Sequence, residues 1–202
     1  MIYTVQTLKE KYKEYSNILQ KIKLEADKGH LIRIKRGLYS DDISSDANVL
    51  ANYCYGPSYI SFEYALYYYG LIPEYVRVIT SAAYKKNKYK KYNSKYLCLE
   101  YKHVPDAVYP LDICILKNED GISYRIASKE KALCDQLYSM YCVRSINDLK
   151  EMIFDNLRVD EEAFMKLDLK KLSDLASQYH TYTLDTLVKY VNNELLNEWI
   201  NK

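Results

Sequence analysis

The sequence predicts an α+β protein with a small N-terminal helix and hairpin unit, an antiparallel sheet and a helical tail. Three observations indicate this order: helical spacing up to about residue 28, a β-rich stretch over about residues 75–127, and helical periodicity over residues 128–202. The chain has 202 residues, of which 49% are hydrophobic, enough to bury one large or two small cores. We expect two domains, residues 1–45 and 46–202.

A short basic hairpin is the centre of the first domain and covers residues 29–39, GHLIRIKRGLY. Apolar strand formers precede Gly37, which supplies the positive φ that a tight turn requires. No acid interrupts the cations, and such a local field suits phosphates. These cations are Arg33, Lys35 and Arg36.

Two short amphipathic helices are expected before the hairpin. The apolar residues Val5, Leu8, Tyr12, Ile18, Leu19, Ile22 and Ala26 fall at helical spacing. Ser16 can cap the second helix, which ends at Lys28 and Gly29. The same spacing also fits one unbroken helix or a coiled-coil seam, since only Ser16 argues for the break.

The order helix, turn, helix, hairpin is that of a winged helix-turn-helix. Polar residues on the second helix could meet base edges or phosphates in a major groove. These exposed positions are Asn17, Gln20, Lys21, Lys23 and Lys28.

The second domain is expected to combine an antiparallel sheet with a helical tail. Helices are predicted at residues 48–55, capped by Asp46, and 62–69, begun by Ser61, with a short extended segment at 59–60 between them. The strands are predicted at residues 76–80, 96–101, 112–117 and 122–127. Ser128 begins a helix to about residue 141, and tail helices follow at residues 147–156, 161–167, 169–178 and 184–200, with Asp160 and Thr183 as N-caps.

Charge is distributed unevenly along the chain, although its formal net value is only +2. Residues 1–40 carry nine cations and four acids, whereas residues 146–202 carry seven cations and eleven acids. The basic N-terminal segment therefore favours a polyanion as its partner. The acidic C-terminal segment favours a protein partner, or its charges only keep the surface solvated. Five cysteines without a C-x-x-C pair, no apolar run long enough for a membrane span and no leader pattern predict a cytoplasmic protein without membrane association.

A lysine and tyrosine run over residues 84–96 has six lysines, four tyrosines and no acid. Its composition suits single-stranded nucleic acid, but a solvated hairpin protected at a sheet edge by its lysines is the commoner meaning. The possible second basic surface consists of Lys85, Lys86, Lys88, Lys90 and Lys91.

No pattern predicts an enzyme, a metal site or a cofactor. Ser128 and Lys131 match the S-x-x-K spacing of serine acyl enzymes, but Ser128 also suits a helix cap. The three histidines are scattered without ligand spacing, and no phosphate-binding or dinucleotide motif occurs. We therefore expect no catalytic residues.

Three segments resemble the AbiEi antitoxins of type IV toxin-antitoxin systems. The matching residues are GHLIRIKRGLY at 29–39, YISFEYAL with GLIP at 59–66 and 70–73, and YRIASKEKALCD at 124–135. The resemblance covers roughly the first 140 residues and implies a transcriptional repressor of its own operon, which binds promoter DNA through an N-terminal winged helix-turn-helix. It implies Gly37 as the wing glycine, Arg33, Lys35 and Arg36 as wing cations, and Asn17, Gln20 and Lys21 as groove-facing positions.

The resemblance also implies an antitoxin role against a nucleotidyltransferase-like toxin in phage abortive infection, usually without a stable complex. The N-terminal segment has room for two helices, whereas winged domains often have three. We therefore expect DNA binding to require a homodimer or additional contacts from the lysine run. The alternative is a protein-interaction module whose acidic tail binds the toxin directly without DNA binding.

Overall fold

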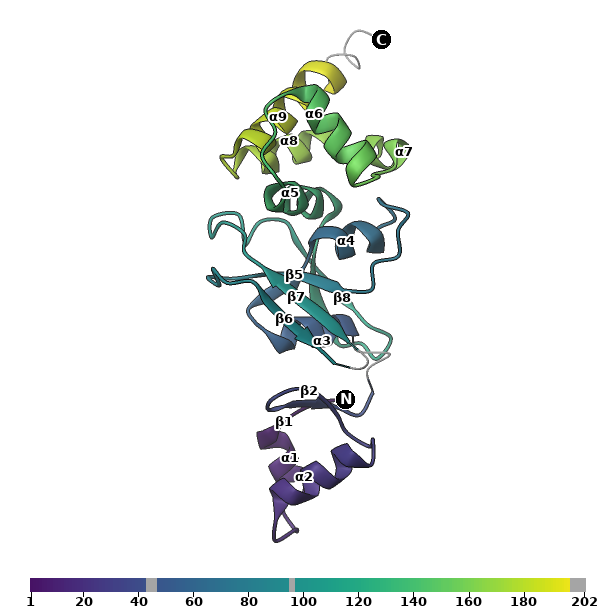
Figure 1. Ribbon diagram of the computed structural model, residues 1–202, viewed down its shortest axis with the longest axis vertical. Helices are drawn as coiled ribbons and strands as arrows, with labels where there is room; N and C mark the ends of the chain where they lie inside the picture. Colours follow the sequence, from purple (N-terminus) through teal and green to yellow (C-terminus); the bar gives the residue numbers. More distant parts are fainter. Residues whose placement is uncertain (43–46, 95–96, 197–202) are drawn as a thin grey trace.

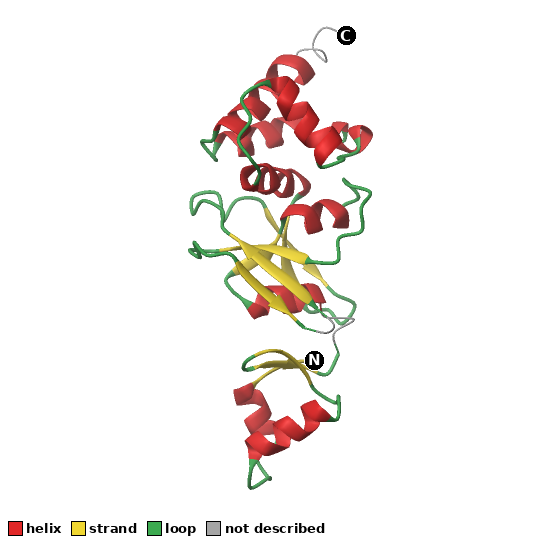
Figure 2. Cartoon of the chain, in the orientation of Figure 1, coloured by secondary structure: helices red, strands yellow, loops and turns green. Residues whose placement is uncertain are grey.

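The chain forms three tiers along its long axis, in a computed structural model that describes residues 1–42, 47–94 and 97–196 (Figure 1). A two-helix unit with a small sheet lies at one end, a larger sheet lies in the middle, and a group of helices lies at the other end (Figure 2). The α+β class predicted from the sequence is confirmed.

The N-terminal unit consists of two helices and a three-stranded antiparallel sheet. Its elements are β1 (Ile2–Thr4), α1 (Val5–Lys11), α2 (Ile18–Asp27), β2 (Ile32–Lys35) and β3 (Leu38–Ser40). β3 is the central strand and pairs with both β1 and β2. The two-helix interpretation is therefore confirmed, and the single unbroken helix is wrong. β1 was not predicted, because three residues are too few to show a period.

Capping residues set the limits of these helices. Thr4 begins α1, where its side chain and that of Thr7 form a capping box. Asn17, and not Ser16, begins α2, since its side chain accepts a hydrogen bond from the backbone N–H of Gln20 at 3.1 Å. Gly29, with φ +78°, follows the last turn as predicted.

The small sheet packs on both of its faces. Tyr3, Leu8, Ile22 and Leu31 form a separate cluster under the two helices. On the other face, Ile34 and Leu38 join the main hydrophobic core of the central tier, with Ile2 and Ile32 packed against it. The hairpin therefore connects the two cores.

The central sheet has six strands in the order β6-β7-β5-β4-β9-β8. β4 pairs with β9 and β5 pairs with β7 in parallel, while the remaining pairs are antiparallel, so the predicted purely antiparallel sheet is wrong. The strands are β4 (Ser58–Ile60), β5 (Ile79–Ala83), β6 (Lys90–Asn93), β7 (Cys98–Lys102), β8 (Ile113–Lys117) and β9 (Ser123–Ala127).

One strand prediction needs correction. The strand expected at residues 76–80 is β5 and begins only at Ile79. The lysine run contains β6, an edge strand that pairs with β7, as expected for a hairpin at a sheet edge. The hairpin of β8 and β9 is confirmed. Asp46, expected as a cap, and Tyr96, expected to begin a strand, lie outside the described residues.

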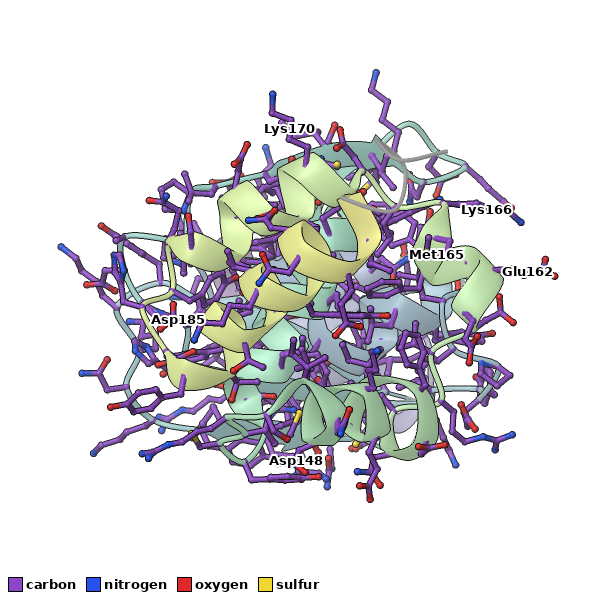
Figure 3. The ribbon with its side chains drawn as sticks, turned by 90° about the horizontal axis from the view of Figure 1, so that it is seen from above. Asp148, Glu162, Met165, Lys166, Lys170 and Asp185 are labelled. Atoms are coloured by element: carbon purple, nitrogen blue, oxygen red, sulfur yellow. The ribbon has the colours of Figure 1, made fainter. Side chains whose placement is uncertain are left out.

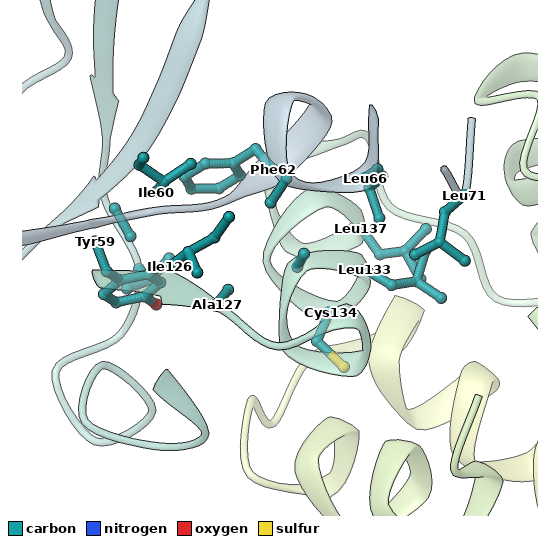
Figure 4. Close-up of a cluster of buried hydrophobic side chains, with 14 of the residues drawn as sticks. Tyr59, Ile60, Phe62, Leu66, Leu71, Ile126, Ala127, Leu133, Cys134 and Leu137 are labelled. Atoms are coloured by element: carbon teal, nitrogen blue, oxygen red, sulfur yellow. The ribbon is translucent and has the colours of Figure 1, made fainter. Parts of the chain in front are cut away.

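Helices cover the sheet on both faces (Figure 1). α3 (Ala47–Cys54) lies on the face toward the N-terminal unit, and α4 (Phe62–Tyr68) and α5 (Lys129–Ser139) lie on the opposite face. Apolar side chains of β4, β9, α4 and α5 meet in a fully buried cluster (Figure 4). Removing this apolar surface from water is the main favourable contribution to folding.

The tail forms a group of short helices, which match the predicted segments within a few residues. α6 (Ile146–Lys150) continues into a π-helical segment at Glu151–Asn156, and α7 (Glu161–Met165), α8 (Leu169–Ser177), α9 (Tyr182–Tyr190) and a second π-helical segment at Val191–Leu196 follow. Asp160 caps α7 as predicted. Thr183 is not an N-cap: α9 begins after Thr181, and the Thr183 hydroxyl accepts from the backbone N–H of Val143.

Candidate nucleic-acid interface

The outward face of α2 carries exposed polar side chains. Ile22 points into the small core, so the residues on the opposite side of the helix face outward. Gln20 and Lys23 are exposed there, as predicted, and Leu19 is 64% exposed although its spacing predicted the apolar face. This outward face therefore mixes an amide, a cation and an apolar side chain.

A groove of about 640 Å³ runs between α2 and β2. Leu19, Lys23 and Asp27 contribute from the helix, and Arg33 contributes from the strand. Neither Lys23 nor Arg33 forms an ion pair with a described residue, and both are exposed. Asp27, the last residue of α2, is the one acid among the described residues that line this groove.

The hairpin turn lies beside this groove and has the predicted geometry. Gly37 has φ +89°, a conformation that favours glycine. The backbone N–H of Val5 donates to the carbonyl of Gly37 at 3.3 Å, which ties the turn to the start of α1. Arg36 is exposed at the turn and forms no ion pair with a described residue.

Lys35 is not a free wing cation, contrary to the prediction. Its ammonium donates a hydrogen bond to the carbonyl of Cys54, at the end of α3, and lies 5.8 Å from the ring centroid of Tyr92. A cation at a helix C-terminus is favourable because carbonyl groups are unpaired there. Lys35 therefore holds the hairpin against the central tier.

Asn17 and Lys21 also have structural partners. Asn17 caps α2, and Lys21 pairs with Glu25 at 2.8 Å and lies 4.7 Å from the ring centroid of Tyr15. Hydrogen bonds from Lys21 and then from His30 lower the pKa of Glu25 to about 2. Lys28 is exposed at the C-terminal end of α2 but does not line the groove.

The second basic surface adjoins the hairpin, and several of its lysines lie over tyrosine rings. Lys90 and Lys35 both lie over the ring of Tyr92, and Lys86 lies 5.6 Å from the ring centroid of Tyr55. Lys91 pairs with Glu100 at 2.6 Å. Lys85 lies over Tyr84, and Lys88 is exposed. The faces of Tyr55 and Tyr92 are therefore occupied and not free to stack on bases.

Ser128 and Lys131 have separate structural roles. The Ser128 hydroxyl caps α5 by accepting from the backbone N–H of Lys131 at 3.1 Å, and it donates to Asp112. The Lys131 ammonium is fully buried and contacts Asp135 at 3.0 Å and the Tyr179 hydroxyl at 2.6 Å. The Lys131 ammonium therefore donates its hydrogen bonds to Asp135 and Tyr179, and not to the Ser128 hydroxyl.

Asp135 is the acceptor at the centre of this buried network. Its carboxylate receives hydrogen bonds from Tyr59 at 3.0 Å, Ser61 at 2.7 Å and Tyr179 at 2.5 Å. Burial, and next the charge of Asp135, raise the pKa of Tyr59 and Tyr179 well above the usual range. The tyrosines therefore stay protonated and act as donors.

No family model matches this chain, and no curated protein matches it either. Within residues 1–42, 47–94 and 97–196, no helix is long and apolar enough to cross a membrane. No group of histidine, cysteine and acidic side chains in the same ranges could hold a metal ion, and all five cysteines are free thiols.

Proposed function

We propose that the chain is a DNA-binding antitoxin of the AbiEi type that represses its own operon. The observation that carries this proposal is the groove of the N-terminal unit, which is lined by the exposed cations Lys23 of α2 and Arg33 of β2, with Arg36 exposed at the adjoining turn. Exposed cations without ion-pair partners neutralise the phosphates of a duplex and release its counterions.

The element order supports a winged helix-turn-helix for this unit. Two helices precede the β2–β3 hairpin, and β1 completes the sheet beside β3. α2, the helix directly before the hairpin, is then the recognition helix, and its first turns present Gln20 and Lys23 to base edges. The hairpin is the wing, with Arg33 and Arg36 on phosphates.

The antitoxin role rests on the segments that resemble the family. Residues 59–66 and 124–135 are far apart in sequence, but Tyr59 and Ser61 both donate to the carboxylate of Asp135. The two segments therefore form one structural unit. In this proposal the chain acts in the cytoplasm without catalysis, opposes a nucleotidyltransferase-like toxin, and binds inverted repeats as a homodimer.

Fluorescence anisotropy with the chain's own upstream DNA tests the repressor function. We expect saturable binding whose affinity falls steeply between about 50 and 200 mM salt. Arg33→Ala and Arg36→Ala should each weaken binding and lower the slope of log K against log salt by about 1. Lys35→Met should leave this slope nearly unchanged, because the ammonium of Lys35 is bound to the carbonyl of Cys54.

The matched control is Lys170→Ala. Lys170 is exposed on α8 (Figure 3), which lies at the end of the molecule away from the N-terminal unit (Figure 1), so its loss removes the same charge from another site. An equal effect of Lys170→Ala and Arg33→Ala would contradict a localised interface. Equal affinity for any duplex would contradict sequence-specific repression.

Co-expression with an adjacent nucleotidyltransferase-like gene product tests the antitoxin role. We expect growth to be restored without a complex that survives purification. A stable stoichiometric complex, together with no DNA binding, would instead establish the chain as a direct protein-interaction module.

A further inference from the structure

We infer that Leu19 recognises thymine methyl groups in the major groove of the bound duplex, an inference that rests on the proposed DNA binding. Leu19 is 64% exposed, whereas Ile22, about one turn further along α2, is buried and Ile18 is half-buried. An apolar side chain in the first turn of a recognition helix needs an apolar partner to contribute to binding.

The position of Leu19 favours a DNA partner. Leu19 and Lys23 are one turn apart on α2, and both line the groove that Arg33 borders. Gln20 is exposed beside them. Leu19 thus shares the groove with Lys23 and Arg33, two cations that have no ion-pair partner among the described residues, and with one acid, Asp27. The cations outnumber the acid, so the surroundings of Leu19 complement a polyanion.

The chemistry of the major groove supplies the matching apolar group. Thymine is the base that presents a C5-methyl group there, and adenine, its partner, presents the N6 and N7 groups that glutamine can bond in pairs. Leu19 and Gln20 are neighbours in the first turns of α2. Together they would favour operator positions that contain A·T pairs.

Deoxyuridine substitution isolates the methyl group, because uracil pairs as thymine does but lacks that group. Anisotropy would be measured with upstream duplexes that contain either thymine or deoxyuridine. Wild-type protein should bind the deoxyuridine duplex about fourfold more weakly for each contacted methyl. Leu19→Ala should weaken binding to the thymine duplex by a similar factor and bind both duplexes nearly equally.

Leu24→Ala provides the matched control. Leu24 is also an exposed leucine of α2, at 45%, but it does not line the groove. This variant should retain the wild-type preference for thymine. Both leucines are exposed, so neither substitution removes core packing.

Three results would overturn the inference. Equal binding of wild-type protein to the two duplexes, with binding itself intact, would refute the methyl contact while leaving the DNA-binding proposal in place. A change in oligomeric state for Leu19→Ala by light scattering would assign Leu19 to a protein interface. Failure of wild-type protein to bind any duplex would remove the proposed function and this inference with it.

Discussion

At the residue scale, Asp135 holds the buried network of the central tier together. Asp135 and Lys131 are fully buried and form an ion pair. Three hydroxyl groups also donate hydrogen bonds to the Asp135 carboxylate. Asp135→Asn would leave the Lys131 ammonium buried without a counter-charge. We expect a loss of about 3–5 kcal/mol in the free energy of unfolding, measured by urea denaturation.

Two further variants control this measurement. Lys170→Met replaces an exposed lysine and should change stability by no more than about 0.5 kcal/mol. The double variant Lys131→Met/Asp135→Asn removes both charges and should recover part of the loss. A cost below about 1 kcal/mol for Asp135→Asn would show that Lys131 does not depend on this carboxylate.

The exposure and backbone conformation of individual residues could be predicted from the sequence better than their interaction partners. Arg33, Arg36, Lys23 and Gly37 have the predicted exposure or conformation, because local pattern determines them. The partner of Lys35, by contrast, is the carbonyl of Cys54, which only the folded chain brings near the hairpin. No spacing rule could identify it.

At the element scale, Glu25 joins the end of α2 to the start of β2. Its carboxylate accepts from Lys21 and His30, and its backbone carbonyl accepts from the N–H groups of His30 and Leu31. Because the folded pKa of Glu25 is about 2 and the usual value is 4.5, its stabilising effect is complete above about pH 4.5. That effect is lost as the pH falls toward about 2.

Glu25→Gln should therefore flatten the acid dependence of stability. Thermal midpoints measured by circular dichroism between pH 6 and pH 2 should fall less steeply in this variant than in the wild type. Glu14→Gln, which changes an exposed acid ahead of α2, should keep the wild-type slope. Identical slopes for the wild type and Glu25→Gln would show that this junction carries no pH-linked stability.

Helices were easier to predict than strands, for a physical reason. A helix of seven or more residues repeats its apolar spacing, as α1, α4 and α5 do, and α5 also has the predicted cap, Ser128. β5 is buried along its whole length and reads ITSAA, with small residues that are weak strand formers. Val76 and Val78, just before β5, are stronger strand formers, so the strand was predicted three residues too early.

At the scale of the whole molecule, the N-terminal unit depends on the central tier. Its own cluster contains only four buried side chains, and the outer face of its sheet contributes Ile34 and Leu38 to the main core. Lys35 adds the hydrogen bond to the end of α3. The sequence predicted a boundary near residue 45, but it could not show that the hairpin belongs to both cores.

A fragment of residues 1–42 should therefore be largely unfolded on its own. Domains of about 40 residues rarely bury enough apolar surface to fold without disulfides, metals or a partner, and this fragment would also expose Ile34 and Leu38 to water. Circular dichroism should show little helix and no cooperative melt, whereas the full chain should protect the amides of α2 from hydrogen exchange. A cooperative melt of the fragment would mean that the N-terminal unit folds independently and that Lys35 only orients this unit on the central tier.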